Sequence, residues 1–133
     1  MYFDAQTIVL ILNDADAAAL AAPAIAATPR RFTSPLAVVE AILTAGPADD
    51  GTTADQRVLN FLDAAGIEIR DMPPSHRMIE AAALADAADA DLIDLLNRVS
   101  ADYYEAAVFV LPDASAEPEV PAAPAEQTDP TKG

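Results

Sequence analysis

The chain has 133 residues, with 22 acidic side chains against seven lysines and arginines, which gives a formal net charge of −15. This length allows one domain with a modest core, and the charge excludes a general attraction to nucleic acid, so RNA binding would need a metal ion or a local arginine patch. The lack of cysteine excludes disulfides, thiolate metal sites and cysteine nucleophiles, and the lack of a long apolar run or a basic signal-peptide start predicts a cytoplasmic protein without membrane contact.

The first elements place an acid at the end of a strand. Residues 1–4 are apolar up to Asp4, which predicts a short buried strand, and the apolar run that follows predicts a helix up to Asn13. Sites in open α/β sheets form outside the carboxyl ends of parallel strands, so Asp4 is the first candidate site residue. Residues 14–28 are mostly alanine and predict a second helix, which Pro23 should kink or divide.

A second strand and a capped helix carry the next acid. Residues 30–33 predict the strand. Ser34 followed by Pro35 marks a helix start, because a serine side chain can accept a backbone N–H bond and proline suits the first helical position. The helix should end at Gly46. Glu40 lies one turn inside it, close to its apolar side, where a carboxylate needs a partner.

Three further helices and two further strands complete the pattern. The helices are predicted over residues 53–65, 75–88 and 90–101, and the strands over residues 67–70 and 108–111. Thr53 and Ser75 are the expected N-caps of the first two of these helices. Residues 114–133 are rich in Pro, Ala, Glu, Ser and Thr and cannot bury enough apolar surface to offset their ordering entropy, which predicts a disordered tail.

The order of these elements predicts the fold class. Strands alternate with helices, which requires right-handed crossovers and gives a small, mostly parallel central sheet between two helical layers. The sequence contains no internal repeat. We therefore predict a helix-rich, three-layer α/β/α domain over residues 1–113, followed by the tail.

Several stretches resemble PIN-domain proteins of the VapC type, which are small toxin ribonucleases paired with antitoxins. The matching stretches are Phe3-Asp4, the segment 29–41 with its Ser-Pro helix start and Glu40, the segment 62–69 that leads into the third strand, and the last strand with the Pro-Asp that follows it. The resemblance covers residues 1–113 and implies the PIN-like version of the three-layer fold.

The resemblance also implies a cluster of four acids that act as catalytic residues and metal ligands. Carried over to this chain, the four are Asp4, Glu40, Asp94 and Asp113. Converging carboxylates can hold Mg²⁺ or Mn²⁺, and such ions activate water and offset charge on phosphate oxygens during phosphodiester hydrolysis. The third acid has two alternatives, Asp91 and Asp102. Asp94 is preferred because Asp102 would leave too little helix before the last strand.

The implied function is that of a metal-dependent endoribonuclease with an RNA substrate, an antitoxin partner and a homodimeric state. The alternative is a catalytically inactive PIN-like domain that acts as a protein-interaction module, because Ala5 and Gln6 follow Asp4 where family members usually carry hydroxyl residues.

The sequence lacks the signatures of other α/β classes. No Gly-Lys of a phosphate-binding loop is present, and the only lysine, Lys132, lies in the tail and not after the last strand, as a receiver-type domain would require. The single histidine, His76, is expected to be exposed.

Overall fold

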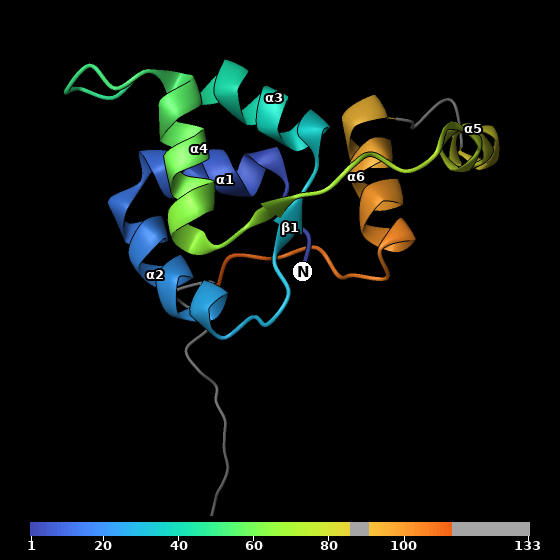
Figure 1. Cartoon of the computed structure of the whole chain (residues 1–133), viewed down its shortest axis with the longest axis horizontal. Coiled ribbons are helices and arrows are strands. Elements are labelled where there is room, and N and C mark those ends of the chain that lie inside the picture. Colours follow the sequence, from blue (N-terminus) through green and yellow to red (C-terminus); the bar gives the residue numbers. More distant parts are fainter. Residues whose placement is uncertain (86–90, 113–133) are drawn as a thin grey trace, which may run out of the picture.

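Six helices and a small parallel sheet make up the part of the chain that the computed structural model describes, residues 1–85 and 91–112 (Figure 1). The helices are α1 (Ala5–Asn13), α2 (Ala15–Ala26), α3 (Pro35–Ala45), α4 (Ala54–Ala65), α5 (Ser75–Leu84) and α6 (Leu92–Tyr103). The strands are β1 (Phe32–Thr33) and β2 (Glu68–Ile69). The prediction of a helix-rich α/β chain with a small parallel sheet is confirmed. The predicted tail, residues 114–133, lies outside the described residues.

The sheet is shorter than the sequence predicts. β1 and β2 pair in parallel, with Phe32 opposite Glu68. The first and last predicted strands each contribute a single bridging residue, because Tyr2 bridges in parallel both to Phe32 and to Val108. The chain leaves the sheet soon after Tyr2, since Asp4 already caps α1. The four predicted strand segments therefore lie side by side and parallel, but the prediction of full strands is wrong for two of them.

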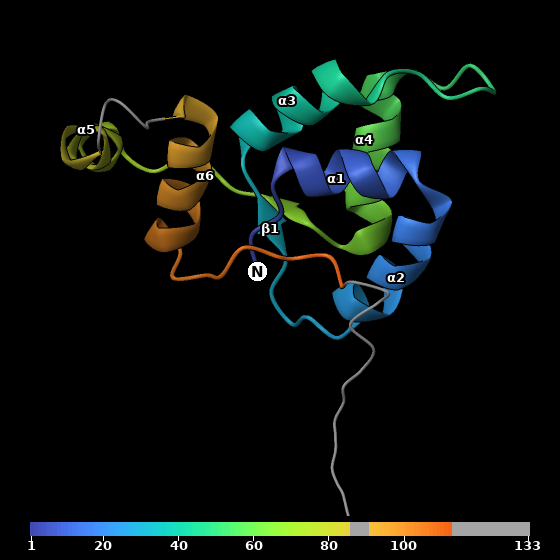
Figure 2. The ribbon, with the colours of Figure 1, turned by 180° about the vertical axis from the view of Figure 1, so that it is seen from behind.

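The helices lie in two groups. α1 packs against α2, α3 and α4, while α5 packs against α6. Figures 1 and 2 show α1 to α4 on one side of β1 and α6 with α5 on the other. No residue of α5 is buried, so this helix projects from the rest of the chain. None of the helices in the described ranges is long and apolar enough to cross a membrane.

Short polar side chains cap the N-termini of α1 and α3. Asp4 Oδ1 accepts the Thr7 N–H of α1 at 2.9 Å, and Ser34 Oγ accepts the Ala37 N–H of α3 at 3.1 Å. Each cap satisfies a backbone donor that has no partner within its helix. The predicted cap at Ser75 is wrong, because Ser75 is itself the first residue of α5. Local capping thus fixes where α1 and α3 begin.

The limits of α5 and α6 differ from the predicted ones. α5 ends at Leu84 and Ala85 is extended, so the helix predicted over residues 75–88 does not continue through Ala85. Residues 86–90 lie outside the described ranges. α6 begins after its cap Asp91 and runs to Tyr103, two residues beyond the predicted end.

The core is built on the first strand segment. Tyr2 and Phe3 are fully buried. Phe3 stacks on Phe109 with ring centroids 4.6 Å apart, and Tyr2 meets Phe32 edge-on at 5.7 Å. Such aromatic pairs stabilise the fold beyond the area that they bury. The predicted burial of this segment is confirmed, and it holds Asp4 at the edge of the core.

One arginine joins the ends of two helices. The guanidinium of Arg57 in α4 donates to Leu12 O at the end of α1 at 2.9 Å, and to Gly46 O at the end of α3 at 2.7 Å. Carbonyls at a helix C-terminus lack partners within the helix, and a cation suits the negative end of the helix dipole. Arg57 therefore connects α1, which Asp4 caps, with α3, which carries Glu40.

Candidate functional site

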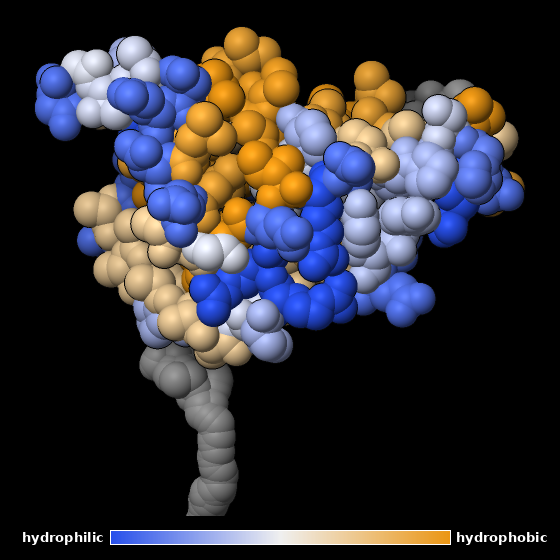
Figure 3. All heavy atoms as spheres, in the orientation of Figure 1, coloured by the Kyte–Doolittle hydropathy of each residue, from blue (hydrophilic) through white to orange (hydrophobic). Residues whose placement is uncertain are grey.

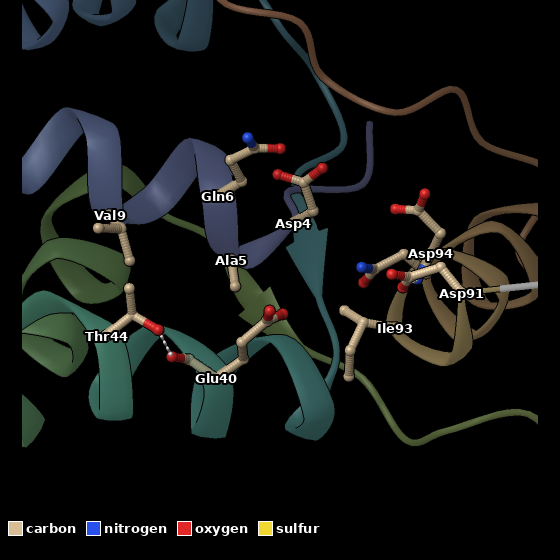
Figure 4. A pocket seen from close by; sticks show the side chains of 10 residues that line it. Asp4, Ala5, Gln6, Val9, Glu40, Thr44, Asp91, Ile93 and Asp94 are labelled. Atoms are coloured by element: carbon tan, nitrogen blue, oxygen red, sulfur yellow. Dashed lines mark hydrogen bonds between the residues drawn. The ribbon is translucent and has the colours of Figure 1, made fainter.

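A polar pocket of about 380 Å³ lies where α1, α3 and the start of α6 meet (Figure 4). Its polar lining residues are Asp4, Gln6, Glu40, Thr44, Asp91, Asp94 and Asn97. The rest of the lining is apolar, from Ala5, Val9 and Ile93. The pocket therefore combines an acidic wall with a small apolar one.

The pocket brings together three of the four predicted acids. Asp4 caps α1, Glu40 lies on the second turn of α3, and Asp94 lies on the first turn of α6. In Figure 4, Asp4 and Glu40 lie on one side of the pocket, and Asp94 lies on the other beside Asp91. Asp113 lies outside the described residues. Three elements that are distant in sequence thus contribute acids to one pocket.

Of the alternatives for the third acid, Asp91 lines the pocket and Asp102 does not. Asp91 caps α6, and its Oδ1 accepts the Asp94 N–H at 3.0 Å. Asp102 lies more than two turns further along α6 and borders a separate hollow beside Arg77. The geometry therefore favours Asp91 and Asp94 over Asp102 as the α6 acids of this pocket.

The acids repel one another across the pocket. Partial burial raises the pKa of Glu40, and the negative charges of Asp4, Asp91 and Asp94 raise it further. Among the described residues that line the pocket there is no lysine, arginine or histidine. The pocket therefore favours a cation, or an anion that arrives together with a cation.

The arrangement of the acids limits how a metal ion could bind. Within residues 1–85 and 91–112, no three acidic or histidine side chains lie close enough to hold one ion among them. Carboxylate oxygens are nevertheless the ligands that hard cations prefer, and Mg²⁺ usually keeps several waters and binds one or two carboxylates directly. The donor set thus fits a hydrated cation and does not fit a dehydrated ion in a cage of three acids.

A buried hydrogen-bond chain supports the pocket, and the sequence did not predict it. The Tyr2 hydroxyl donates to Asn97 Oδ1 at 2.6 Å and lies 2.7 Å from Ser34 Oγ. All three side chains are buried, and burial raises the pKa of Tyr2, so its hydroxyl stays protonated. This chain links the first strand segment, the start of α3 and the middle of α6. Since these elements carry Asp4, Glu40 and Asp94, it fixes their relative positions.

Two sequence signals could have pointed to these supporting residues. Tyr2 lies two residues before Asp4, so both side chains share one face of an extended segment. Asn97 lies three residues after Asp94, so both share one face of α6. The hydrogen bond itself joins residues 95 positions apart, which no local pattern reveals.

Comparison with known proteins gives no family assignment. The chain matches no protein-family model and no curated protein. The resemblance to PIN domains therefore rests on the sequence pattern described above, and the function is inferred from the pocket.

Glu40→Gln is expected to stabilise the protein at neutral pH. Because the pKa of Glu40 is raised in the folded state, the folded state binds more protons than the unfolded state between the ordinary carboxyl pKa of 4.5 and the raised value. Stability therefore falls as the pH rises through that window, and remains lower above it. Removing the charge should restore roughly 0.5 kcal/mol, as is typical of one charge interaction near the protein surface.

Urea unfolding of both proteins across the acidic and neutral range measures this effect. The gain should be largest at neutral pH and should vanish well below pH 4.5, where Glu40 is protonated in both states. Asp63→Asn, an exposed acid on α4 outside the pocket, is the matched control and should show no such trend. A gain that is equal at all pH values would contradict repulsion within the pocket.

Proposed function

We propose that the chain is a metal-dependent endoribonuclease of the VapC type, in which Asp4, Glu40 and Asp94 hold a hydrated Mg²⁺ or Mn²⁺ ion, in part through the waters that the ion keeps. The observation that carries the proposal is that these acids, expected from the resemblance to PIN domains, come from three separate elements and line one pocket. Asp91 lines the α6 side of the same pocket. Asp113 is the fourth acid of the proposed set on the resemblance alone.

The proposed architecture is the three-layer PIN-like fold. The parallel arrangement of Val108, Tyr2, β1 and β2 supports it, since a PIN-like sheet needs four neighbouring parallel segments. The separation of α1 to α4 from α5 and α6 supports it as well (Figures 1 and 2). In such a sheet, Asp4 would lie at the carboxyl edge, where sites form.

The pocket residues and the proposed ion would have different chemical roles. A bound ion would supply an activated water and offset the charge that develops on phosphate oxygens. In the metal-free pocket, burial and the neighbouring carboxylates raise the pKa of Glu40, and a bound cation would oppose this by offsetting their negative charge. Asp4 keeps a fixed orientation through its bond from the Thr7 N–H. Without a cation the acids repel RNA, so RNA binding should itself depend on the metal.

The proposed partners are an antitoxin and a second copy of the chain, as the resemblance implies. Figure 3 shows apolar atoms gathered over α3 and α4. Val39, Leu43 and Leu59 are exposed on these helices, Leu43 to 81%. Contiguous apolar surface of this kind is typical of protein contacts and supports a protein partner at this face.

The alternative function is that of an inactive PIN-like domain which acts through protein contacts. Two observations favour it: the absence of three converging ligands within the described ranges, and the apolar surface over α3 and α4. In that case the acids would maintain solubility and would not hold an ion.

An RNA cleavage assay separates the two proposals. The purified protein is incubated with a mixed pool of single-stranded RNA in Mg²⁺, in Mn²⁺ and in excess EDTA. The ribonuclease proposal predicts cleavage with either ion and none in EDTA. No cleavage in any condition, together with no calorimetric Mg²⁺ binding, would favour the inactive interaction domain.

A further inference from the structure

Among the described residues that line the pocket, the Asn97 amide is the one buried side-chain donor without a protein partner. Asn97 lines the pocket, yet it is only 9% exposed. Its Oδ1 accepts the hydroxyl proton of Tyr2 at 2.6 Å. Within the described residues, no hydrogen bond satisfies its Nδ2 group, which therefore has two donors available for a ligand.

The surrounding charges explain this orientation of the amide. The Tyr2 hydroxyl has one proton, which goes to Asn97 Oδ1, and the nearby Ser34 Oγ can donate in turn to Tyr2. With Oδ1 committed to Tyr2, the Nδ2 group is left for the side of the pocket. A donor is favoured there, because an oxygen facing Asp91, Asp94 and the other acids would add to their repulsion.

The other side-chain donors of the pocket are already used or exposed to solvent. The Thr44 hydroxyl already donates to Glu40 O at 2.7 Å, and Gln6 is exposed to solvent. A phosphoryl group that enters beside four acids needs a neutral donor as well as a cation, since each unmade hydrogen bond of a buried group costs about 1–3 kcal/mol. Asn97 is the donor already held in place for it.

We propose that Asn97 donates a hydrogen bond from Nδ2 to a non-bridging phosphoryl oxygen of the bound RNA, and that Tyr2 is the positioning residue that holds this amide. The inference rests on the proposed ribonuclease function and adds to it the substrate atom that one residue contacts. Asn97 would then contribute to RNA affinity, while the acids contribute to metal affinity.

Asn97→Ala tests directly whether Asn97 contributes to RNA affinity and not to metal affinity. The ligand is a short 2′-O-methyl oligoribonucleotide, its affinity is measured in Mg²⁺ by fluorescence anisotropy, and gel electrophoresis after each titration verifies that it is still intact. We expect about tenfold weaker oligonucleotide binding with Mg²⁺ affinity unchanged by calorimetry. Asn60→Ala, an exposed asparagine on α4, is the matched control and should bind like the parent. Tyr2→Phe should also weaken oligonucleotide binding without changing Mg²⁺ affinity.

NMR of the unmodified protein tests the same contact without a variant. The chain has three asparagines, Asn13, Asn60 and Asn97, so their side-chain amide signals can be assigned. The Asn97 amide protons should move downfield on addition of the oligonucleotide, and the other two should not. An unmoved Asn97 signal with parent-like binding of Asn97→Ala would overturn the inference and leave the ribonuclease proposal intact. No Mg²⁺-dependent binding by the parent would overturn both.

Discussion

Asp4→Asn is expected to lower metal-dependent RNA cleavage by about 100-fold. Loss of a carboxylate that faces the metal ion should lower activity at least as much as loss of a residue in the outer shell of a metal site. Asparagine has nearly the same shape and is an equally good helix cap, so it should still accept the Thr7 N–H. The fold should therefore survive while the charge is lost. Initial cleavage rates and melting temperatures of parent and variant measure the two effects separately.

Asp102→Asn is the matched control for this change. Asp102 is an exposed aspartate on α6, and it lies outside the acidic pocket beside Arg77. Cleavage by this variant should equal that of the parent. Equal losses in both variants would point to a general effect of charge on RNA binding and would contradict a specific role for the pocket.

Arg57→Met is expected to lower the free energy of unfolding by about 3 kcal/mol, because more than one hydrogen bond to a charged group is lost. The guanidinium donates to Leu12 O, Ala45 O and Gly46 O, and to the side-chain oxygen of Asn13 at 2.8 Å. Methionine keeps the apolar stem of the side chain but leaves these acceptors at two helix ends without their donor. The charge that complements both helix dipoles is lost as well.

Urea unfolding followed by circular dichroism measures the Arg57 effect. Arg98→Met, at an exposed position on α6, should change stability by no more than about 0.5 kcal/mol, as is usual for surface substitutions. A loss below about 1 kcal/mol for Arg57→Met would show that α1 and α3 are held together by their apolar contacts alone.

Local signals in the sequence were sufficient for the starts of α1 and α3 and for placing Asp4 and Glu40. Asp4 and Ser34 are followed by backbone N–H groups that their side chains accept, and such capping depends only on neighbouring residues. Asp4 could be placed at the end of a strand segment because burial and the following helix are both visible in the sequence. Glu40 could be placed near the pocket because it lies one turn inside a helix with a defined start.

Long-range contacts decided the features that the sequence did not predict. Tyr2 and Val108 look like parts of full strands, but each takes part only in isolated bridges, and α1 begins directly after Asp4, which ends the Tyr2 segment. The role of Arg57 depends on the ends of two other helices, which its own surroundings in the sequence do not reveal. The bond from Tyr2 to Asn97 spans 95 positions and is likewise invisible to local patterns.

The most direct test of the central claim is to locate the cation on the protein. Substoichiometric Mn²⁺ broadens the NMR signals of nearby nuclei, so an assigned ¹H–¹⁵N spectrum maps its position. We predict selective broadening of the backbone amides of Ala5, Glu40 and Asp94, with the exposed acidic loop at Asp49 and Asp50 unaffected. Broadening that appears first at Asp49 and Asp50, or evenly over the acidic surface, would contradict a metal site in the pocket.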